Sequence, residues 1–154
     1  MALAFEKLFA PVPARPQLRA AQEGETRLGV VVVFTSVEPT IQALRKAGVL
    51  ASSLHARITL VVPQVVPYPL PLTSPPVLLD FSERRFRAIA EESPVDTTVR
   101  LYLCRDQMET LGAVLASHSL IVVGGRRRWW PTWEERLARR LRRAGHEVIF
   151  TETE

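Results

Sequence analysis

Cysteine is nearly absent from this chain of 154 residues, because Cys104 is the only one. No intramolecular disulfide can form, so the chain does not belong to the small secreted domains that disulfides hold together. The three histidines, His55, His118 and His146, are not spaced as metal ligands, nor do they cluster with the cysteine. We therefore expect no metal site and a protein of the reducing cytoplasm.

Long apolar runs are missing as well. The longest, residues 28–34, has the length of a strand, whereas a membrane-spanning helix needs about 20 apolar residues. The first residues also lack the basic segment, long apolar segment and cleavage site of a secretory signal. The sequence thus predicts no membrane span.

The amino-terminal residues differ in composition from the rest of the chain. Residues 1–26 combine a short apolar segment with prolines, which predicts an extension made of a short helix and a proline-rich lead-in. Its apolar side chains are expected to pack on the domain, to stay loosely ordered or to bind a partner; they are Leu3, Phe5, Leu8 and Phe9. One domain is expected over residues 27–154, since about 150 residues bury enough surface to fold unaided.

Lysine is scarce, with two residues against 18 arginines. Eight of these arginines lie in residues 126–143 beside only Glu134 and Glu135, a local net charge of +6 that leaves −2 for the rest of the chain. Such a segment attracts anions: phosphate, nucleic acid or an acidic protein surface. The alternative is that the arginine content reflects genome composition alone.

Five apolar, β-branched segments alternate with helical patterns along the chain. The expected strands are residues 28–34, 57–62, 97–104, 120–123 and 146–151. Their nearly continuous apolar character is typical of strands buried on both faces of a parallel sheet. The alternation predicts an α/β fold, a three-layer α/β/α sandwich with a mainly parallel five-stranded sheet and right-handed crossovers.

Capping residues mark the expected helices. Ser36, Asp80, Asp106 and Thr132 each precede a helical pattern, and the last three have a glutamate three positions on. Gly145 is a left-handed stop after the last helix. Six prolines in residues 63–76 predict an extended loop there.

The chain resembles the universal stress protein family over most of residues 27–151. The resemblance rests on LIVVGG at residues 120–125, on the capped helix that follows and on the final HEVIF strand. It implies a Rossmann-like domain of the larger adenine nucleotide-binding class. ATP-binding members have a longer glycine-rich loop after the fourth strand and an acidic residue after the first, where this chain has an arginine-tryptophan loop and Thr35.

Ligands of open α/β sheets bind at the carboxyl ends of the strands. We therefore expect an altered nucleotide or anion site there, made of Thr35, Ser36, Gly124, Gly125, Arg126, Arg127, Arg128 and Thr132. An adenine nucleotide is the ligand that the resemblance implies, and no cofactor is assigned. The alternative is that the two glycines only turn the chain, while Trp129 and Trp130 cover the end of the sheet.

The function expected first is that of a regulatory or adaptor domain acting through protein contacts. The resemblance implies a homodimer paired along the last strand, at Val148, Ile149 and Phe150, and the arginine-rich helix suits an acidic partner protein. The alternatives are a stress sensor that binds ATP, AMP or a cyclic dinucleotide, and a nucleic-acid-binding module using the arginines and tryptophans.

Catalytic signatures are lacking. No serine lies in a nucleophile-elbow context and no Walker loop with its lysine occurs. Cys104 closes an apolar strand, where a lone cysteine is usually a core residue. An enzyme is the least supported class.

Overall fold

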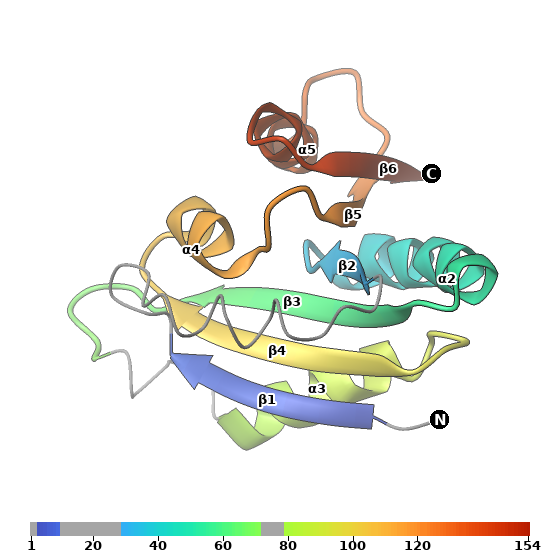
Figure 1. Ribbon diagram of the computed structural model, residues 1–154. Coiled ribbons are helices and arrows are strands. Elements are labelled where there is room, and N and C mark those ends of the chain that lie inside the picture. Colours follow the sequence, from blue (N-terminus) through green and yellow to red (C-terminus); the bar gives the residue numbers. More distant parts are fainter. Residues whose placement is uncertain (1–2, 10–28, 72–78) are drawn as a thin grey trace.

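The computed structural model describes residues 3–9, 29–71 and 79–154 (Figure 1). The strands are β1 (Leu3–Phe9), β2 (Gly29–Val33), β3 (Arg57–Val65), β4 (Thr97–Cys104), β5 (Leu120–Arg126) and β6 (Glu147–Thr153). The helices are α2 (Val37–Leu54), α3 (Leu79–Ala90), α4 (Gln107–Val114) and α5 (Trp133–Arg143).

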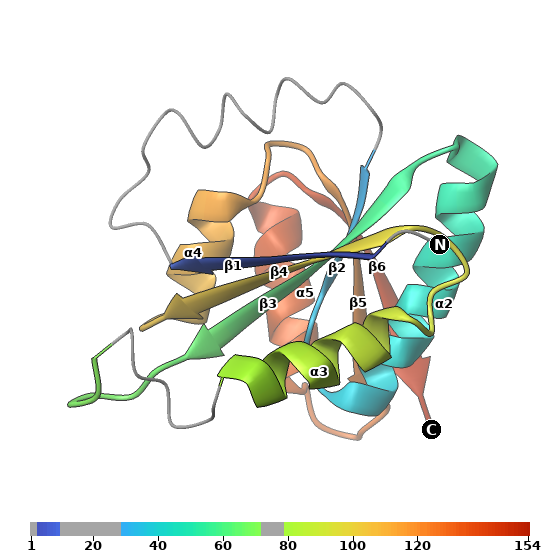
Figure 2. The same ribbon diagram turned by 90° about the horizontal axis from the view of Figure 1, so that it is seen from below.

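All described strands belong to one parallel sheet in the order β1-β4-β3-β2-β5-β6. Without β1 this is a five-stranded sheet in which the central strand, β2, comes first in the chain and the order reverses beside it. Helices α2 and α3 pack on one face, and α4 and α5 pack on the other (Figure 2). The predicted three-layer α/β/α fold is confirmed.

The core divides into two layers because the side chains of a strand alternate between its faces. Val30, Val32 and Leu60 lie with the helices α2 and α3 in one cluster, while Val61 and Val123 lie with α4 and α5 in the other. These strand residues are at most 3% exposed. The continuous apolar runs in the sequence are explained by this burial on both faces.

The amino-terminal segment is a strand and not the predicted short helix. Residues Leu3–Phe9 pair in parallel with β4, from Leu3 beside Thr97 to Phe9 beside Leu103, so the sheet has a sixth strand. Seven residues are too few for a stable isolated helix, whereas a strand obtains its hydrogen bonds from the edge it joins. The proline-rich lead-in and the side chains of the segment lie outside the described residues, and the domain boundary at residue 27 stays a prediction.

Three strands end later than predicted: β3, β5 and, by two residues, β6. β3 continues through Pro63 to Val65, although prolines predicted a loop from residue 63. Phe34 N–H donates to Val61 O at 2.9 Å, and β2 pairs with β3 no further than this point. Like the backbone groups of Val61, the backbone nitrogen of Pro63 is on the side of β3 that faces β2. Because β2 has already ended there, the N–H that proline lacks would have no partner in the sheet.

β5 likewise continues through Gly124 and Gly125, which pair with Thr151 and Glu152 instead of stopping the strand. A Cβ atom on Gly124 would collide with the carbonyl group of Pro39 in the first turn of α2. One on Gly125 would collide with the ring of Phe150. Both glycines therefore allow close packing against the strand.

The helix ends follow the sequence in most cases. The Asp106 Oδ1 atom accepts a hydrogen bond from Glu109 N at 2.8 Å, and Thr132 Oγ1 accepts one from Glu135 N at 3.3 Å. Gly145 has a φ of 95°, as predicted for a left-handed stop. Ser36 occupies the N-cap position of α2 but makes no capping hydrogen bond, and the side chain of Asp80 lies outside the described residues.

The contact of Gly124 with Pro39 gives the first testable prediction. Replacing Gly124→Ala should lower the free energy of unfolding by about 1–3 kcal/mol, because the helix must move away from the strand. The matched control is Gly112→Ala in α4, where a Cβ would meet no atom within 4 Å and the helix should gain about 1 kcal/mol. Urea unfolding measures both. Equal stability of the Gly124 variant and the wild type would contradict the packing argument.

Candidate functional site at the carboxyl edge of the sheet

A pocket of about 430 Å³ opens at the carboxyl ends of β2 and β3, next to the point between β2 and β5 where the strand order reverses. Open α/β sheets bind ligands at this edge, outside the carboxyl ends of the strands. Residues from every layer line it: Phe34, Thr35, Val62, Pro63, Gln64, Val65, Phe81, Ser82, Arg85, Phe86, Gln107 and Trp133. We call it the edge pocket.

Aromatic rings form one wall of the edge pocket. The rings of Phe34 and Phe86 meet edge to face, with centroids 4.9 Å apart and an angle of 80°. The guanidinium carbon of Arg85 lies 5.8 Å from the first centroid and 5.7 Å from the second. Of the lining residues Arg85 alone is charged, so the pocket offers an apolar wall and one cation.

Polar groups are available in the edge pocket too. The side-chain oxygen Oε1 of Gln64 is buried and has no hydrogen-bond partner among the described residues. A buried acceptor without a donor costs free energy, and a ligand N–H or O–H group would satisfy it. Gln107 is less free, because its Nε2 donates to Pro63 O at 3.3 Å.

Two of the predicted site residues come together here. Thr35 lines the edge pocket, and its Oγ1 donates a hydrogen bond to Gly124 O at 2.7 Å. Its N–H donates to Thr40 Oγ1 at 3.2 Å. Thr35 is thus held by β5 and α2 at once, which fixes the end of β2 beside the pocket.

The other predicted residues do not line the edge pocket. Ser36 is the N-cap residue of α2, and Thr132 is the N-cap residue of α5. The space that a Cβ atom on Gly125 would need is occupied by Phe150 and Glu134. Arg126, Arg127 and Arg128 are exposed and are not among the residues that line the edge pocket.

The positive end of the α5 helix dipole already has acidic side chains of the same helix beside it. Glu134, only 8% exposed, and Glu135 both lie in its first turn, where acidic side chains stabilise the positive end of a helix. Further negative charge from a triphosphate would be repelled by these carboxylates.

The structure contradicts the alternative in which two tryptophans cover the end of the sheet. Trp129 and Trp130 do not cover the end of the sheet, since they are 99% and 79% exposed. Trp133, the first residue of α5, is 44% exposed and lines the edge pocket. Sequence reasoning also missed Arg85 and Gln64. The position of Gln64 after an apolar strand was a usable signal, but Arg85 lies inside a helix with several other arginines.

Arg105, another residue at this edge, holds the loop that follows β3. Its two terminal nitrogens donate to Val66 O and Leu70 O, both at 2.7 Å, and its guanidinium carbon lies 4.1 Å from the centroid of the Tyr68 ring. The neighbouring thiol of Cys104 is buried, and burial raises its pKa. Its burial is typical of a cysteine that packs in a core.

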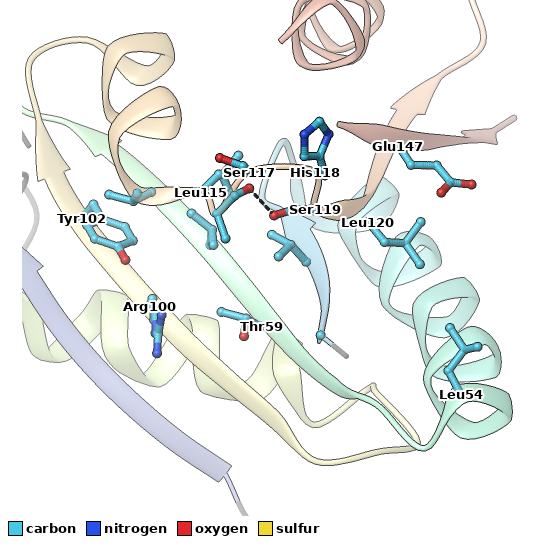
Figure 3. A pocket seen from close by; sticks show the side chains of 15 residues that line it. Leu54, Thr59, Arg100, Tyr102, Leu115, Ser117, His118, Ser119, Leu120 and Glu147 are labelled. Atoms are coloured by element: carbon cyan, nitrogen blue, oxygen red, sulfur yellow. Dashed lines mark hydrogen bonds between the residues drawn. The ribbon is translucent and has the colours of Figure 1, made fainter. Parts of the chain in front are cut away.

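A second hollow, of about 640 Å³, lies on the face of the sheet near the amino ends of β2 and β5 (Figure 3). Arg100, Tyr102, His118 and Glu147 are among the residues around it. Residues 10–28, which connect β1 to β2, lie outside the described residues, so we assign no ligand to this hollow. In the part of the chain that the structure describes, no group of acidic, histidine or cysteine side chains could hold a metal ion.

His146, beside this hollow, is held in its neutral form. Its Nδ1 atom accepts a hydrogen bond from Ser119 N at 3.1 Å, which requires that nitrogen to be unprotonated. Burial lowers the pKa of His146, and the nearby His118 lowers it further.

Comparison with known proteins supports the fold. The sequence matches no protein-family model and no curated protein. Among solved structures, a universal stress protein family member from Burkholderia pseudomallei is 24% identical, with a TM-score of 0.54 over 83% of this chain and 98% of its own. A universal stress protein from Archaeoglobus fulgidus is 15% identical, with a TM-score of 0.55 over 84% and 97%. A universal stress protein in complex with cAMP is 16% identical, with a TM-score of 0.53 over 84% and 100%.

The protonation of His146 makes stability depend on pH. With a folded-state pKa below the ordinary value of about 6.5, the unfolded chain takes up the proton first as the pH falls. The histidine's contribution is therefore complete above about pH 6.5 and is lost below it. We expect His146→Gln to show a smaller loss of unfolding free energy than the wild type between about pH 7 and about pH 5.

The control for this titration is His55→Asn, since His55 is exposed and asparagine tolerates its left-handed φ of 51°. It should keep the pH dependence of the wild type. Unfolding in urea at each pH measures both variants, and identical slopes for the two would refute the role of His146.

Proposed function

We propose that this protein is a universal stress protein-like regulatory or adaptor domain that acts through protein contacts, first of all as a homodimer. The observation that carries the proposal is the edge of β6. Among the described strands β6 pairs with β5 alone, so one side of its backbone is open. An open edge of seven residues can pair with a second copy.

The side chains predicted for the dimer edge bear on how this pairing would occur. Val148, Ile149 and Phe150 pack against the two core clusters of their own domain. Pairing would therefore use the backbone groups of β6, while these side chains anchor the strand to the core of its own domain. The exposed arginines of α5 suit an acidic partner protein in addition.

A homodimer along β6 can be broken by removing one outward N–H. Glu147 N donates to Ser119 O, and Thr153 O accepts from Arg127 N, so these residues face β5 and Glu152 faces away. Glu152→Pro should leave the sheet intact and raise the dimer dissociation constant about tenfold or more. Light scattering at tens of micromolar measures the mass.

Glu152→Ala is the control, because it removes the carboxylate but keeps the N–H. It should remain as dimeric as the wild type. A wild type that is strictly monomeric at these concentrations, or a proline variant that dimerises equally, would refute edge pairing.

The second candidate function is binding of a small nucleotide in the edge pocket, and the lone acceptor of Gln64 favours it. A base offers both a flat ring for the aromatic wall and an N–H for that acceptor. Arg85 suits one phosphate group. The glycines that would cradle a triphosphate are Gly124 and Gly125, and the space beside their Cα atoms is occupied by Pro39 and Phe150. AMP or a cyclic nucleotide therefore fits this site better than ATP. One structural neighbour is a complex with cAMP.

Calorimetry with AMP, cAMP, ATP and a cyclic dinucleotide tests this candidate. We expect AMP and ATP to bind within about tenfold of each other, because the second and third phosphates find no partners. Arg85→Gln should weaken AMP about tenfold, as expected for one charged hydrogen bond, and leave adenosine unchanged.

Arg139→Gln, an exposed arginine of α5, serves as the matched control and should bind AMP normally. No heat with any nucleotide would end the candidate. ATP binding more than about tenfold tighter than AMP would show a triphosphate cradle and contradict the site described above.

A catalytic function is not proposed. The lone cysteine suits a reducing compartment, and we place the protein in the cytoplasm on that ground. No helix of the described residues has the length and apolar character needed to cross a membrane.

A further inference from the structure

The loop between β5 and α5 carries the most exposed aromatic surface of the described residues. We call residues 126–132, from the last residue of β5 to the N-cap of α5, the tryptophan loop; the connection between the two elements lies at the top of Figure 1. Trp129 is 99% exposed and Trp130 is 79% exposed, more than any other large apolar side chain described. Adjacent bare indoles are unfavourable in water, so their exposure points to a partner.

Cations surround these two rings. Arg126, Arg127 and Arg128 directly precede them and are exposed. Arg127 forms only a loose ion pair, with its Nε atom 4.0 Å from Glu152 Oε2 and its side chain 80% exposed. The solvent face of α5 adds further exposed arginines: Arg136, Arg139, Arg140 and Arg143. The surface therefore complements an anionic partner.

We propose that the tryptophan loop docks the protein reversibly on an anionic lipid surface. Tryptophan rings favour the boundary between lipid headgroups and acyl chains, and each arginine near an anionic surface adds attraction. Two insertable rings beside three cations supply both of the signals that peripheral anchoring needs. This inference does not depend on the dimer or on the edge pocket.

The geometry favours a bilayer over single-stranded nucleic acid. Base stacking uses rings that the protein holds still as a platform, as Trp133 is held against the edge pocket at 44% exposure. Trp129 has almost no protein atoms against it, and would lose side-chain entropy on stacking. The headgroup region of a bilayer, in contrast, accepts two rings in any orientation and requires no fixed spacing between them.

Co-sedimentation with vesicles tests the proposal. The wild type should bind vesicles of phosphatidylcholine with about 30% phosphatidylserine, and bind phosphatidylcholine alone weakly, with affinity falling as salt screens the charges. Trp129→Ala with Trp130→Ala should lower the affinity about tenfold or more, as each buried ring contributes apolar area. Tryptophan emission should shift to the blue on binding.

Neutralising Arg126, Arg127 and Arg128 to glutamine should lower affinity by on the order of 100-fold, at about fivefold for each charge. Val49→Ala, which shortens an exposed apolar side chain on α2, is the control and should bind as the wild type does. Circular dichroism verifies that each variant is folded.

Several outcomes would overturn the proposal. These are no binding to the anionic vesicles, equal binding by the double tryptophan variant, and equal binding to neutral vesicles. Tight binding of an oligonucleotide that the tryptophan changes abolish, without vesicle binding, would assign the loop to nucleic acid instead. A loss of the dimer in the double tryptophan variant, again without vesicle binding, would assign it to a second copy.

Discussion

The arrangement of this site depends on the close approach of α2 to β5. The carbonyl group of Pro39 lies where a side chain at position 124 would be, and Thr35 Oγ1 donates to Gly124 O at 2.7 Å in the same region. The two contacts join the end of β2 to the strand across the point where the sheet order reverses. The first contact requires a glycine at position 124, and the second requires a hydroxyl at position 35. Together they fix the end of β2 beside the edge pocket.

The same packing determines which polar groups face the edge pocket. Backbone N–H groups bind phosphates when small residues leave them accessible at a loop and a helix amino end. Here the glycines are inside β5, and the first turn of α5 already contains Glu134 and Glu135. Among the polar residues that line the edge pocket, Gln64 on β3 has the unpartnered acceptor and Arg85 on α3 has the only charge. Both therefore lie on the β3 side of β2, away from β5.

The fold class was predictable because it follows from burial: a strand covered on both faces must be apolar throughout, and such strands alternated with capped helices. What failed was local and context-dependent. Residues Leu3–Phe9 lack a period that separates helix from strand, and the available edge of β4 decided the outcome. Pro63 and the two glycines were interpreted by their intrinsic preferences, whereas their neighbours in the sheet make each of them compatible with a strand. Thr35 was found because it ends a buried strand. Arg85 could not be found, since nothing in a helical arginine indicates which way it faces.

The extension of β5 connects two features that the sequence treats separately. Because the strand stays paired with β6 as far as Arg126 beside Thr153, the chain leaves the sheet at its rim and does not fold back over the edge pocket. Arg127 N then donates to Thr153 O at 3.0 Å, which directs the next residues outward. None of the three arginines lines the edge pocket, and Trp129 and Trp130 leave the end of the sheet uncovered. The extension of β5 through residues 124–126, where the sequence predicts the end of the strand, thus places Trp129 and Trp130 in the exposed connection to α5.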